Sequence, residues 1–494
     1  MTPEAYRERW AALRRGPADE GRLHHLARQV ALSFMDRALF SGRYESAYVD
    51  LLCAMATAPG SDAANRAGAS ALFGIVIEGL CDDFEDPQTA VYNQVMSQVL
   101  GYCRRLPAAR GLDRRLTAFG LRTERDIWRR IETLRRRLPR RRIRRSPDRI
   151  LFLSRMTVGA DVAITSVLIQ RFESAFPAAE LVLAGDPRME QVFGGHPRLR
   201  FRGLEYARRG GLLERFSSWH RLLEVVAQEG GPRTLVVDPD SRLTQLGILP
   251  VTDPRRYLFF DSRADAPGGA RRSMSELANA WADRVLGRAA PVPPAVWLSE
   301  PLRRRGEELV EALRAQGARH LVAVNLGVGG NPRKRVGDRF EARLLTYLLE
   351  GPQTVVVLDK GAGEEEIERS GRLLCGLAAA GIPVAHVRPG GDPPRLEGGR
   401  GAVGIEGGLG EVAAVIARSD EFVGYDSAFQ HIAAALGIPT CVVFAGSNNP
   451  RFVHRWRAGG PGRVRVIHVD TLSRSPLFDE EDVVARVASA RETP

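Results

Sequence analysis

Apolar residues recur at helical spacing in the first 148 residues of the chain and at strand spacing after them. Segments 21–40, 44–58, 67–80 and 89–105 each carry an apolar stripe at intervals of three and four residues, and stretches containing Pro and Gly separate them. Because this part has no convincing β-branched run, residues 1–148 are predicted to form an all-α N-terminal domain that ends in a basic linker.

From residue 149 on, short β-branched runs alternate with helical patterns. Strands are predicted for the runs at 150–154, 180–185, 234–240 and 257–262, and in a second set at 320–327, 354–360, 383–389, 421–427 and 440–446. This order is typical of α/β proteins, so we expect two Rossmann-like, doubly wound domains over 149–300 and 301–494, with a cleft between them. The closing helical pattern at 478–491 is expected to pack back across both lobes.

Composition narrows the class of protein without naming a function. The 494 residues are 44% hydrophobic and 26% charged, which is ordinary for a globular protein. No apolar run approaches the ~18 residues of a membrane span, and the N-terminus is charged where a signal peptide needs apolar residues. Five scattered cysteines without a Cys-x-x-Cys pair indicate a reduced, cytoplasmic protein with no structural zinc or other metal site.

Positive charge is concentrated in one stretch. The net charge is +12, and the densest run is Arg135–Arg145. It is interpreted either as a solvated helix face and tether, or as a surface for an anionic membrane or a phosphorylated acceptor, which would make the protein peripheral on the inner membrane. Nucleic acid is not expected as a partner, because no aromatic stacking platform or binding motif accompanies the charge.

Lysine is rare in this sequence. Only two of the 71 basic residues are lysines, Lys334 and Lys360, and both follow predicted strands of the second set. A position that keeps Lys where the chain otherwise uses Arg suggests a need for a compact point charge.

Two loops after predicted strands carry candidate chemistry for a phosphate and a proton. In the loop 154–166, Asp161 is expected at or near a helix N-cap facing the cleft, where it acts as a general base or only as a cap. In the loop 325–340, the glycines with Lys334 and Arg335 are suited to a phosphate, although this glycine pattern is not specific.

Two further loops carry a carboxylate cluster and a helix start. Glu364 and its neighbours at 365 and 366 either bind ribose hydroxyls or are first-turn acids favoured by the helix dipole. Asp426 and Ser427 end a strand just before a helix, and His431 lies about one turn into it. Such a helix start is an anion site, or simply a capped helix with a core histidine.

The string DSAFQHIAAALGIP, from Asp426 to Pro439, resembles the D-S-G-x-x-H-x-A-A-A-x-G-x-P signature of the lipopolysaccharide heptosyltransferase family, glycosyltransferase family nine. Ala428 stands where that signature has glycine. The loops KRVGDRF, GAGEEE and TVGADVAITS are similar to three further motifs of the family, with Ala160 inserted in the last.

The resemblance implies a GT-B fold and transfer of a sugar, typically heptose from ADP-heptose, to a glycan or lipopolysaccharide-type acceptor with inversion. It implies no metal and no cofactor besides the nucleotide-sugar donor. Asp161 takes the position of the catalytic base, and the donor-binding positions are Lys334, Arg335, Glu364, Asp426, Ser427, Ala428 and His431. The alternatives are another GT-B nucleotide-sugar enzyme, such as an epimerase, and a non-catalytic binding protein of the same fold.

Overall fold

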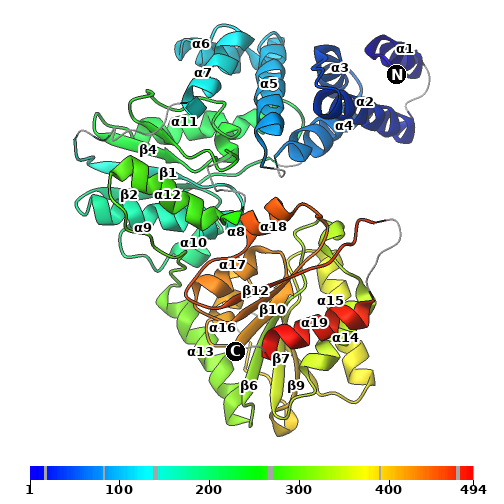
Figure 1. The fold of residues 1–494 in the computed structure, drawn as a ribbon, viewed down its shortest axis with the longest axis vertical. Helices are drawn as coiled ribbons and strands as arrows, with labels where there is room; N and C mark the ends of the chain where they lie inside the picture. The colour runs from blue at the N-terminus through cyan, green and yellow to red at the C-terminus, as the bar shows by residue number, and fades with distance from the viewer. Residues whose placement is uncertain are drawn as a thin grey trace.

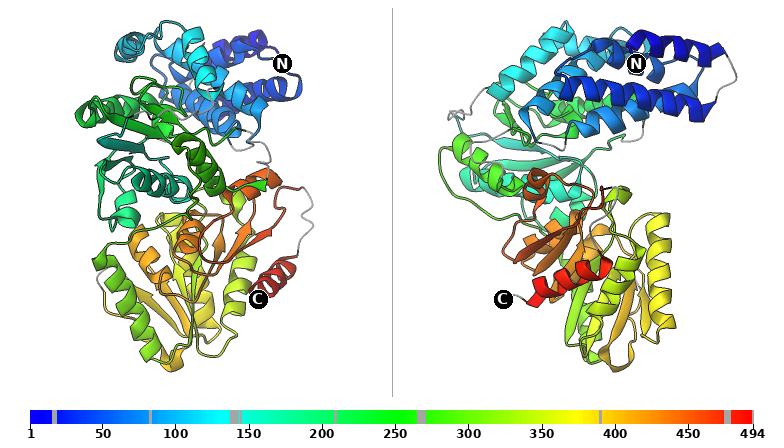
Figure 2. Two further views of the ribbon diagram at one scale, coloured as in Figure 1. Left: turned by 60° about the vertical axis from the view of Figure 1, so that its left-hand side comes forward. Right: turned by 45° about the vertical axis from the view of Figure 1, so that its right-hand side comes forward.

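A computed structural model of the chain describes residues 1–15, 19–81, 84–136, 143, 145–207, 210–264, 271–388, 391–473 and 479–492. Helices at the N-terminal end lie against a first α/β lobe, and a second α/β lobe lies on the opposite side of the first (Figure 1). Two further views show the same order of the three parts along the long axis (Figure 2).

The N-terminal part is helical, as predicted. Its described helices are α1 (Pro3–Arg15), α2 (Glu20–Phe40), α3 (Ser46–Ala56), α4 (Asp62–Ala71), the π-helix η1 (Leu72–Ile77), α5 (Asp86–Cys103), the 3-10 turn η2 (Pro107–Ala109), α6 (Arg110–Ala118) and α7 (Glu124–Arg136). Short polar side chains begin several of them: the Asp19 carboxylate accepts from the Arg22 backbone N–H at 3.0 Å, and Ser61 caps α4 in the same way.

The first lobe contains a five-stranded parallel sheet in the order β3-β2-β1-β4-β5. Its strands are β1 (Arg149–Leu153), β2 (Glu180–Gly185), β3 (Leu199–Gly203), β4 (Thr234–Asp238) and β5 (Tyr257–Phe259). The central strand β1 pairs with β2 on one side and β4 on the other, with Ile150 opposite both Leu181 and Leu235. Strand β3 was not predicted, because Arg alternates with apolar residues at this exposed edge.

The two faces of this sheet belong to different apolar cores. Leu151 and Leu153 join the core of the N-terminal helices, whereas Ile150 and Phe152 join a core shared with the second lobe. Because neighbouring side chains of a strand point to opposite faces, one strand connects both cores. The N-terminal helices are thus packed against a face of the first sheet.

The helices of the first lobe include a local irregularity at the candidate base. They are α8 (Val158–Ala160), the π-helix η3 (Asp161–Thr165), α9 (Ser166–Ala175), α10 (Met189–Phe193), α11 (Ser217–Glu229) and α12 (Met274–Leu286), with short 3-10 turns η4 (Glu214–Phe216) and η5 (Arg242–Thr244). A π turn contains one residue more than an α turn. The helix thus continues from Val158 to Ala175 through this π turn.

The second lobe contains a seven-stranded parallel sheet in the order β12-β11-β10-β6-β7-β9-β8. Its strands are β6 (His320–Asn325), β7 (Thr354–Asp359), β8 (Val384–Val387), β9 (Gly401–Ile405), β10 (Glu421–Tyr425), β11 (Thr440–Phe444) and β12 (Val464–His468). Strands β9 and β12 were not predicted, because glycines interrupt the first and charged residues the second.

Helices cover both faces of this second sheet. They are α13 (Glu300–Ala315), α14 (Asp338–Leu348), α15 (Glu364–Ala379), α16 (Leu409–Ile416), α17 (Ala428–Ala435), α18 (Pro450–Trp456) and α19 (Glu480–Glu492), with 3-10 turns η7 (Pro332–Lys334) and η8 (Glu397–Gly399). The fold is therefore α/β with two parallel sheets after a helical part, as the sequence predicts.

The prediction that the closing helix crosses both lobes is wrong. Helix α19 packs against α14, β11 and β12 of the second lobe. Its ion pairs explain this position: Glu481 pairs with Arg343 of α14 at 2.6 Å, and Arg491 pairs with Glu421 of β10. Opposite charges on α14 and β10 of the second lobe thus hold the helix on its own lobe.

The two lobes meet where the carboxyl ends of their strands face each other. Helix α8 and the π-helix η3 of the first lobe contact α17, and α10 contacts α16. The backbone N–H of Gly410 donates to the side-chain oxygen of Gln191 at 3.1 Å across this junction. No helix in the described part of the chain is long and apolar enough to span a bilayer.

Two arginines of the basic stretch form hydrogen bonds and an ion pair with the first lobe. Arg130 of α7 donates to the carbonyl oxygens of Gly247 and Ile248 at 2.6 and 2.9 Å, and Arg135 pairs with Asp261 at 2.7 Å. These arginines tie the helical part to the first lobe. Most of the densest run, residues 137–142 and 144, lies outside the described residues.

Candidate functional site

In the second sheet the order of strand addition reverses at β6: the strands that follow it first are added on its β7 side, and the later ones on its β10 side. Ligands of open α/β sheets bind at such a switch point, beyond the carboxyl ends of the strands. The side-chain amide of Asn325, the last residue of β6, donates through its Nδ2 to Asp359 at 2.7 Å, and its Oδ1 accepts from the Ser427 hydroxyl at 3.0 Å. One side chain therefore connects the ends of β6 and β7 with the start of α17.

Lys334 and Asp426 form an ion pair at this switch point. The Lys334 Nζ lies 2.5 Å from Asp426 Oδ2, and the other carboxylate oxygen accepts from Gln430 at 2.6 Å. The Lys334 side chain is 25% exposed, whereas Asp426 is nearly buried. A partly exposed ammonium group is thus held in one orientation at the edge of the sheet.

The neighbouring Arg335 points in a different direction. Its guanidinium group bonds to the carboxylates of Asp338 and Glu341, and the Glu341 contact is 2.8 Å. Glu341 is fully buried and also accepts from the Tyr425 hydroxyl at 3.1 Å. Arg335 therefore anchors the loop that carries Lys334 to the body of the lobe.

Helix α17 begins at Ala428, directly after Ser427, and its first residues are half-buried. The N–H groups and the positive dipole end of a helix start favour an anion. His431 lies one turn in and is 4% exposed, and burial lowers the pKa of its imidazole to about 4. This histidine is consequently neutral at pH 7 and adds no positive charge at the helix start.

Of the three glutamates after β7, Glu366 lies toward the site, whereas the family resemblance pointed to Glu364. Glu364 is exposed at the first turn of α15. Glu366 accepts from the backbone N–H of Val328 at 3.2 Å, and its carboxylate lies beside Gly327 in the loop after β6. The sequence could not single out Glu366, because three consecutive glutamates look alike until the helix phase is known.

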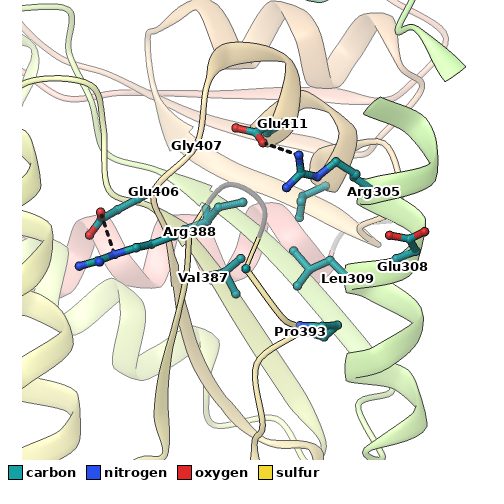
Figure 3. Close-up of a pocket in the computed structure, with 13 residues that line it drawn as sticks. Arg305, Glu308, Leu309, Val387, Arg388, Pro393, Glu406, Gly407 and Glu411 are labelled. Atoms are coloured by element: carbon teal, nitrogen blue, oxygen red, sulfur yellow. Dashed lines mark ion pairs between the residues drawn. The ribbon is translucent and has the colours of Figure 1, made fainter. Parts of the chain in front are cut away.

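A pocket lies along the same edge of the sheet, between α13, the ends of β8 and β9, and the start of α16 (Figure 3). Its empty volume is about 550 Å³ when the part open to solvent is included. Leu309, Val387 and Ile405 form apolar walls, and the rim has two ion pairs: Arg305 with Glu411 at 3.5 Å, and Arg388 with Glu406 at 3.8 Å.

The second lysine connects this pocket with the switch point. Lys360 directly follows β7, is 8% exposed, and pairs with Glu406 at the end of β9. A small hollow beneath Asn325 and Asp359 shares Ile405 with the wall of the pocket. Polar groups and hollows thus follow the sheet edge from Lys334 to the pocket.

Asp161 does not cap the helix, contrary to the prediction. Thr157 occupies the N-cap of α8, and the Asp161 side chain is fully buried. Its carboxylate accepts from Ser154 Oγ at 2.7 Å, the Arg155 backbone N–H at 2.8 Å and Thr165 Oγ1 at 2.7 Å. Burial raises the pKa of this carboxyl to about 6, against the effect of the hydrogen bonds.

The other acids at this edge of the first sheet are buried as well. Asp238 ends β4 and accepts from the Ser241 N–H and the Tyr257 hydroxyl, and burial raises its pKa to about 6. Asp240 is fully buried and bonded to Ser262 at 2.7 Å. The Asp-Pro-Asp sequence therefore shapes a turn after the strand.

A glycine marks the contact between the two edges. A methyl group on Gly159 would lie 2.9 Å from Cδ2 of His431 and 3.1 Å from Cα of Ala428. These distances are shorter than ordinary contacts between carbon atoms. Gly159 therefore allows α8 to approach the start of α17 closely.

The structure brings together Lys334, Asp426, Ser427 and Glu366 at the second sheet, while Asp161 lies at the facing edge of the first lobe. Asn325 and Gln430 were missed by sequence reasoning, and Glu366 was not singled out from its neighbours. Asn325 is a polar residue near the carboxyl end of the predicted strand 320–327, and this position was the signal that could have found it. In the part of the chain that the structure describes, no group of three or more His, Cys, Asp or Glu side chains could hold a metal ion.

The comparison of the sequence with known protein families agrees with the signature at the carboxyl edge of the second sheet. Residues 406–486 match the model of glycosyltransferase family 9 (heptosyltransferase). The matched segment contains Asp426, Ser427, Ala428 and His431, so the predicted resemblance is confirmed there. Lys334, Glu364 and Asp161 lie outside it. None of the curated proteins matches the sequence.

Several solved structures have a similar shape. A family 9 glycosyl transferase from Veillonella parvula has a TM-score of 0.48 at 16% identity and covers 70% of this chain and 90% of that chain. E. coli heptosyltransferase WaaC with ADP has a TM-score of 0.45 at 16% identity, and E. coli ADP-heptose lps heptosyltransferase II has 0.44 at 17%. Each of these two matches covers 69% of this chain and 99% of the E. coli chain.

Proposed function

We propose that this protein is a glycosyltransferase of the GT-B type that transfers heptose from ADP-heptose to a glycan or lipopolysaccharide-type acceptor. One observation carries the proposal. The segment that matches the heptosyltransferase model includes Asp426–His431, and these residues lie with Lys334 at the switch point of the second sheet. A switch point with a cation and a helix start is suited to a diphosphate.

The donor would bind along the edge of the second sheet. Its diphosphate would bind the Lys334 ammonium group and the first N–H groups of α17, in competition with Asp426 for the lysine. Glu366, which already lies beside the loop after β6, would accept from the ribose hydroxyls, with Glu364 as the candidate from the family resemblance. The pocket beside α13 would take the nucleobase between its apolar walls.

The reaction would be a single displacement with inversion. The acceptor hydroxyl loses its proton to a carboxylate base and its oxygen bonds to the anomeric carbon, while the bond from that carbon to the diphosphate breaks on the opposite face. The negative charge on the leaving diphosphate is stabilised by Lys334 and the α17 dipole, so a metal is not needed for this step.

Asp161 is the proposed base. Its three hydrogen-bond donors include two hydroxyl groups, those of Ser154 and Thr165. A substrate hydroxyl could replace one of these donors, because it makes the same kind of hydrogen bond. With a pKa of about 6, the carboxyl group is mainly ionised above pH 7 and still accepts a proton well.

The direct test incubates the full chain with ADP-, GDP- and UDP-sugars, with and without candidate acceptors, and follows nucleotide release and product by mass spectrometry. The proposal expects ADP release that depends on both ADP-heptose and the acceptor. Isomerised donor sugar would instead identify an epimerase. Donor binding without turnover, with a complete set of acceptors, would identify a binding protein.

We also propose that α7 brings the enzyme to an anionic membrane surface. Trp128 is 39% exposed on this helix, and the exposed arginines Arg125, Arg129 and Arg136 accompany it. Arginine is attracted to anionic headgroups, and tryptophan favours the membrane interface. Binding to vesicles with anionic lipid, weakened in Trp128→Ala, would support this surface. Equal binding to neutral vesicles, or preference for a nucleic-acid duplex, would contradict it.

A further inference from the structure

One buried side chain of the N-terminal part packs outside the core of that part. Phe84 precedes α5, is 3% exposed, and belongs to the apolar core that the two lobes share. Among the buried apolar side chains described before residue 137, every other one belongs to the core between the helices and the first sheet. Phe84 therefore connects the helical part with the second lobe.

The contact is with helix α18. The Phe84 ring lies 6.4 Å from the ring of Phe452 and 6.2 Å from that of Trp456, measured between centroids. The Arg451 guanidinium donates to the Phe84 carbonyl oxygen at 2.7 Å, and Arg455 lies 5.8 Å over the Phe84 ring. One helix thus supplies both the apolar and the polar partners of a single residue.

The backbone of Phe84 indicates that this contact is specific. Its φ is +55°, which L-residues other than Asn and Asp rarely adopt. Such a conformation persists where the surroundings determine it. The ring packing and the hydrogen bond from Arg451 provide these surroundings.

The same two rings of α18 also lie near the candidate donor site. The Lys334 Nζ lies 5.8 Å from the ring centroid of Phe452, and the His431 ring lies 6.2 Å from that of Trp456. Phe452 and Trp456 therefore link Phe84 to Lys334 and His431 at the carboxyl edge of the second sheet. In Figure 1 the start of α5 points toward α18, at the junction of the three parts.

The helical part is itself fixed to the first lobe. Besides the bonds of Arg130 and Arg135, the Tyr92 hydroxyl of α5 donates to the Gln245 carbonyl at 3.3 Å. Tyr92 lies on α5, which begins just after Phe84, and Arg135 also pairs with Asp86 at the start of α5 at 2.9 Å. The position of the Phe84 ring therefore follows the first lobe. If the second lobe moved relative to the first, the contact between Phe84 and α18 would have to break.

We propose that Phe84 is a positioning residue for donor binding. It holds α18 in place, and through Phe452 and Trp456 it fixes Lys334 and His431 relative to the first lobe. This inference rests on the proposed function for its catalytic consequence, but the docking of Phe84 on α18 does not. The helical part then acts as a component of the transferase site.

The experiment uses the full chain with Phe84→Ala, Phe84→Leu and Phe84→Tyr, and Phe40→Ala as a matched control, because Phe40 is 85% exposed on α2. ADP affinity is measured by calorimetry, and kcat and KM for the donor by ADP release. We expect Phe84→Ala to weaken ADP binding and raise the donor KM about tenfold, Phe84→Leu to do so less, and Phe84→Tyr and Phe40→Ala to resemble the wild type. A fall in kcat at unchanged KM and ADP affinity would overturn the positioning role.

A distance measurement separates this inference from the proposed function. Cys375 on α15 is an exposed cysteine, and the other four are buried, so spin labels on Cys375 and on an introduced Phe40→Cys would report the distance between the helical part and the second lobe. We expect a narrow distribution that Phe84→Leu and Phe84→Ala broaden and Phe84→Tyr preserves. An unchanged distribution in folded Phe84→Ala and Phe84→Leu overturns the docking. If the wild type binds no ADP while the two variants still broaden the distribution, the proposed function is contradicted and the docking is supported.

Discussion

The carboxyl edges of the two sheets have the same topology but use their charged groups differently. At the second sheet, Lys334 is a quarter exposed and its carboxylate partner Asp426 holds it toward the edge. At the first sheet, Asp161, Asp238 and Asp240 are all fully buried and bonded to nearby hydroxyl and N–H groups. The switch-point rule locates both edges, but only the contacts show which edge presents a charged group to a ligand.

Because their charged groups differ, the two edges are suited to different roles. The second edge has a cation and a helix start that can bind an anion without rearrangement of the sheet. The first edge has a carboxylate whose hydrogen bonds must be exchanged before it can take a proton.

The largest effect is expected for Asp161→Asn, with Asp238→Asn as its control. Both carboxyl groups are buried, bonded to donors and raised in pKa to about 6, so both variants should lose comparable stability. Only Asp161→Asn should lose transfer, by about 10²–10⁴ in kcat, because a general base contributes that much. ADP affinity should stay unchanged in both. An equal loss of kcat in the two variants would show that Asp161 only shapes the loop.

The second prediction concerns His431 at the junction of the edges. Its pKa in the folded protein, about 4, lies below the value near 6.5 of an unfolded chain. The stabilisation from neutral burial is therefore complete above pH 6.5 and is lost as the pH falls toward 4, by up to about 3 kcal/mol. Denaturant unfolding at pH 7 and pH 4.5 should show a smaller decline for His431→Gln than for the wild type. The exposed His24→Gln should decline as the wild type does, and a wild-type decline in His431→Gln would contradict the burial argument.

A smaller effect is expected for Gly159→Ala. The new methyl group would meet His431 and the backbone of Ala428, and overpacking of this kind costs about 1–3 kcal/mol. Gly371→Ala on α15 is the control, since no atom lies within 4 Å of the added methyl and helix propensity favours Ala there. Thermal unfolding should show a lower Tm for the first variant only. Equal Tm values would mean that the two edges are not in close contact in solution.

Much of the fold could be predicted, because buried parallel strands are continuous apolar runs and helices alternate with them. Strands β3, β9 and β12 were missed where arginine or glycine interrupts that pattern. At the site, Lys334, Asp426 and Ser427 followed from their positions at strand ends. Glu366 and the N-cap at Thr157 did not, because they depend on helix phase, and the contact of Phe84 with α18 joins segments that no local pattern relates.

The central claim is that a nucleoside diphosphate binds at the second edge through Lys334. The most direct measurement is the ADP affinity of Lys334→Ala against the wild type, by calorimetry, with the adjacent exposed Arg333→Ala as the matched control. The account predicts that Lys334→Ala weakens ADP binding about 10- to 100-fold, as loss of a charge-assisted bond worth about 1.5–3 kcal/mol would, while Arg333→Ala binds as the wild type does. Wild-type affinity in a folded Lys334→Ala would contradict it.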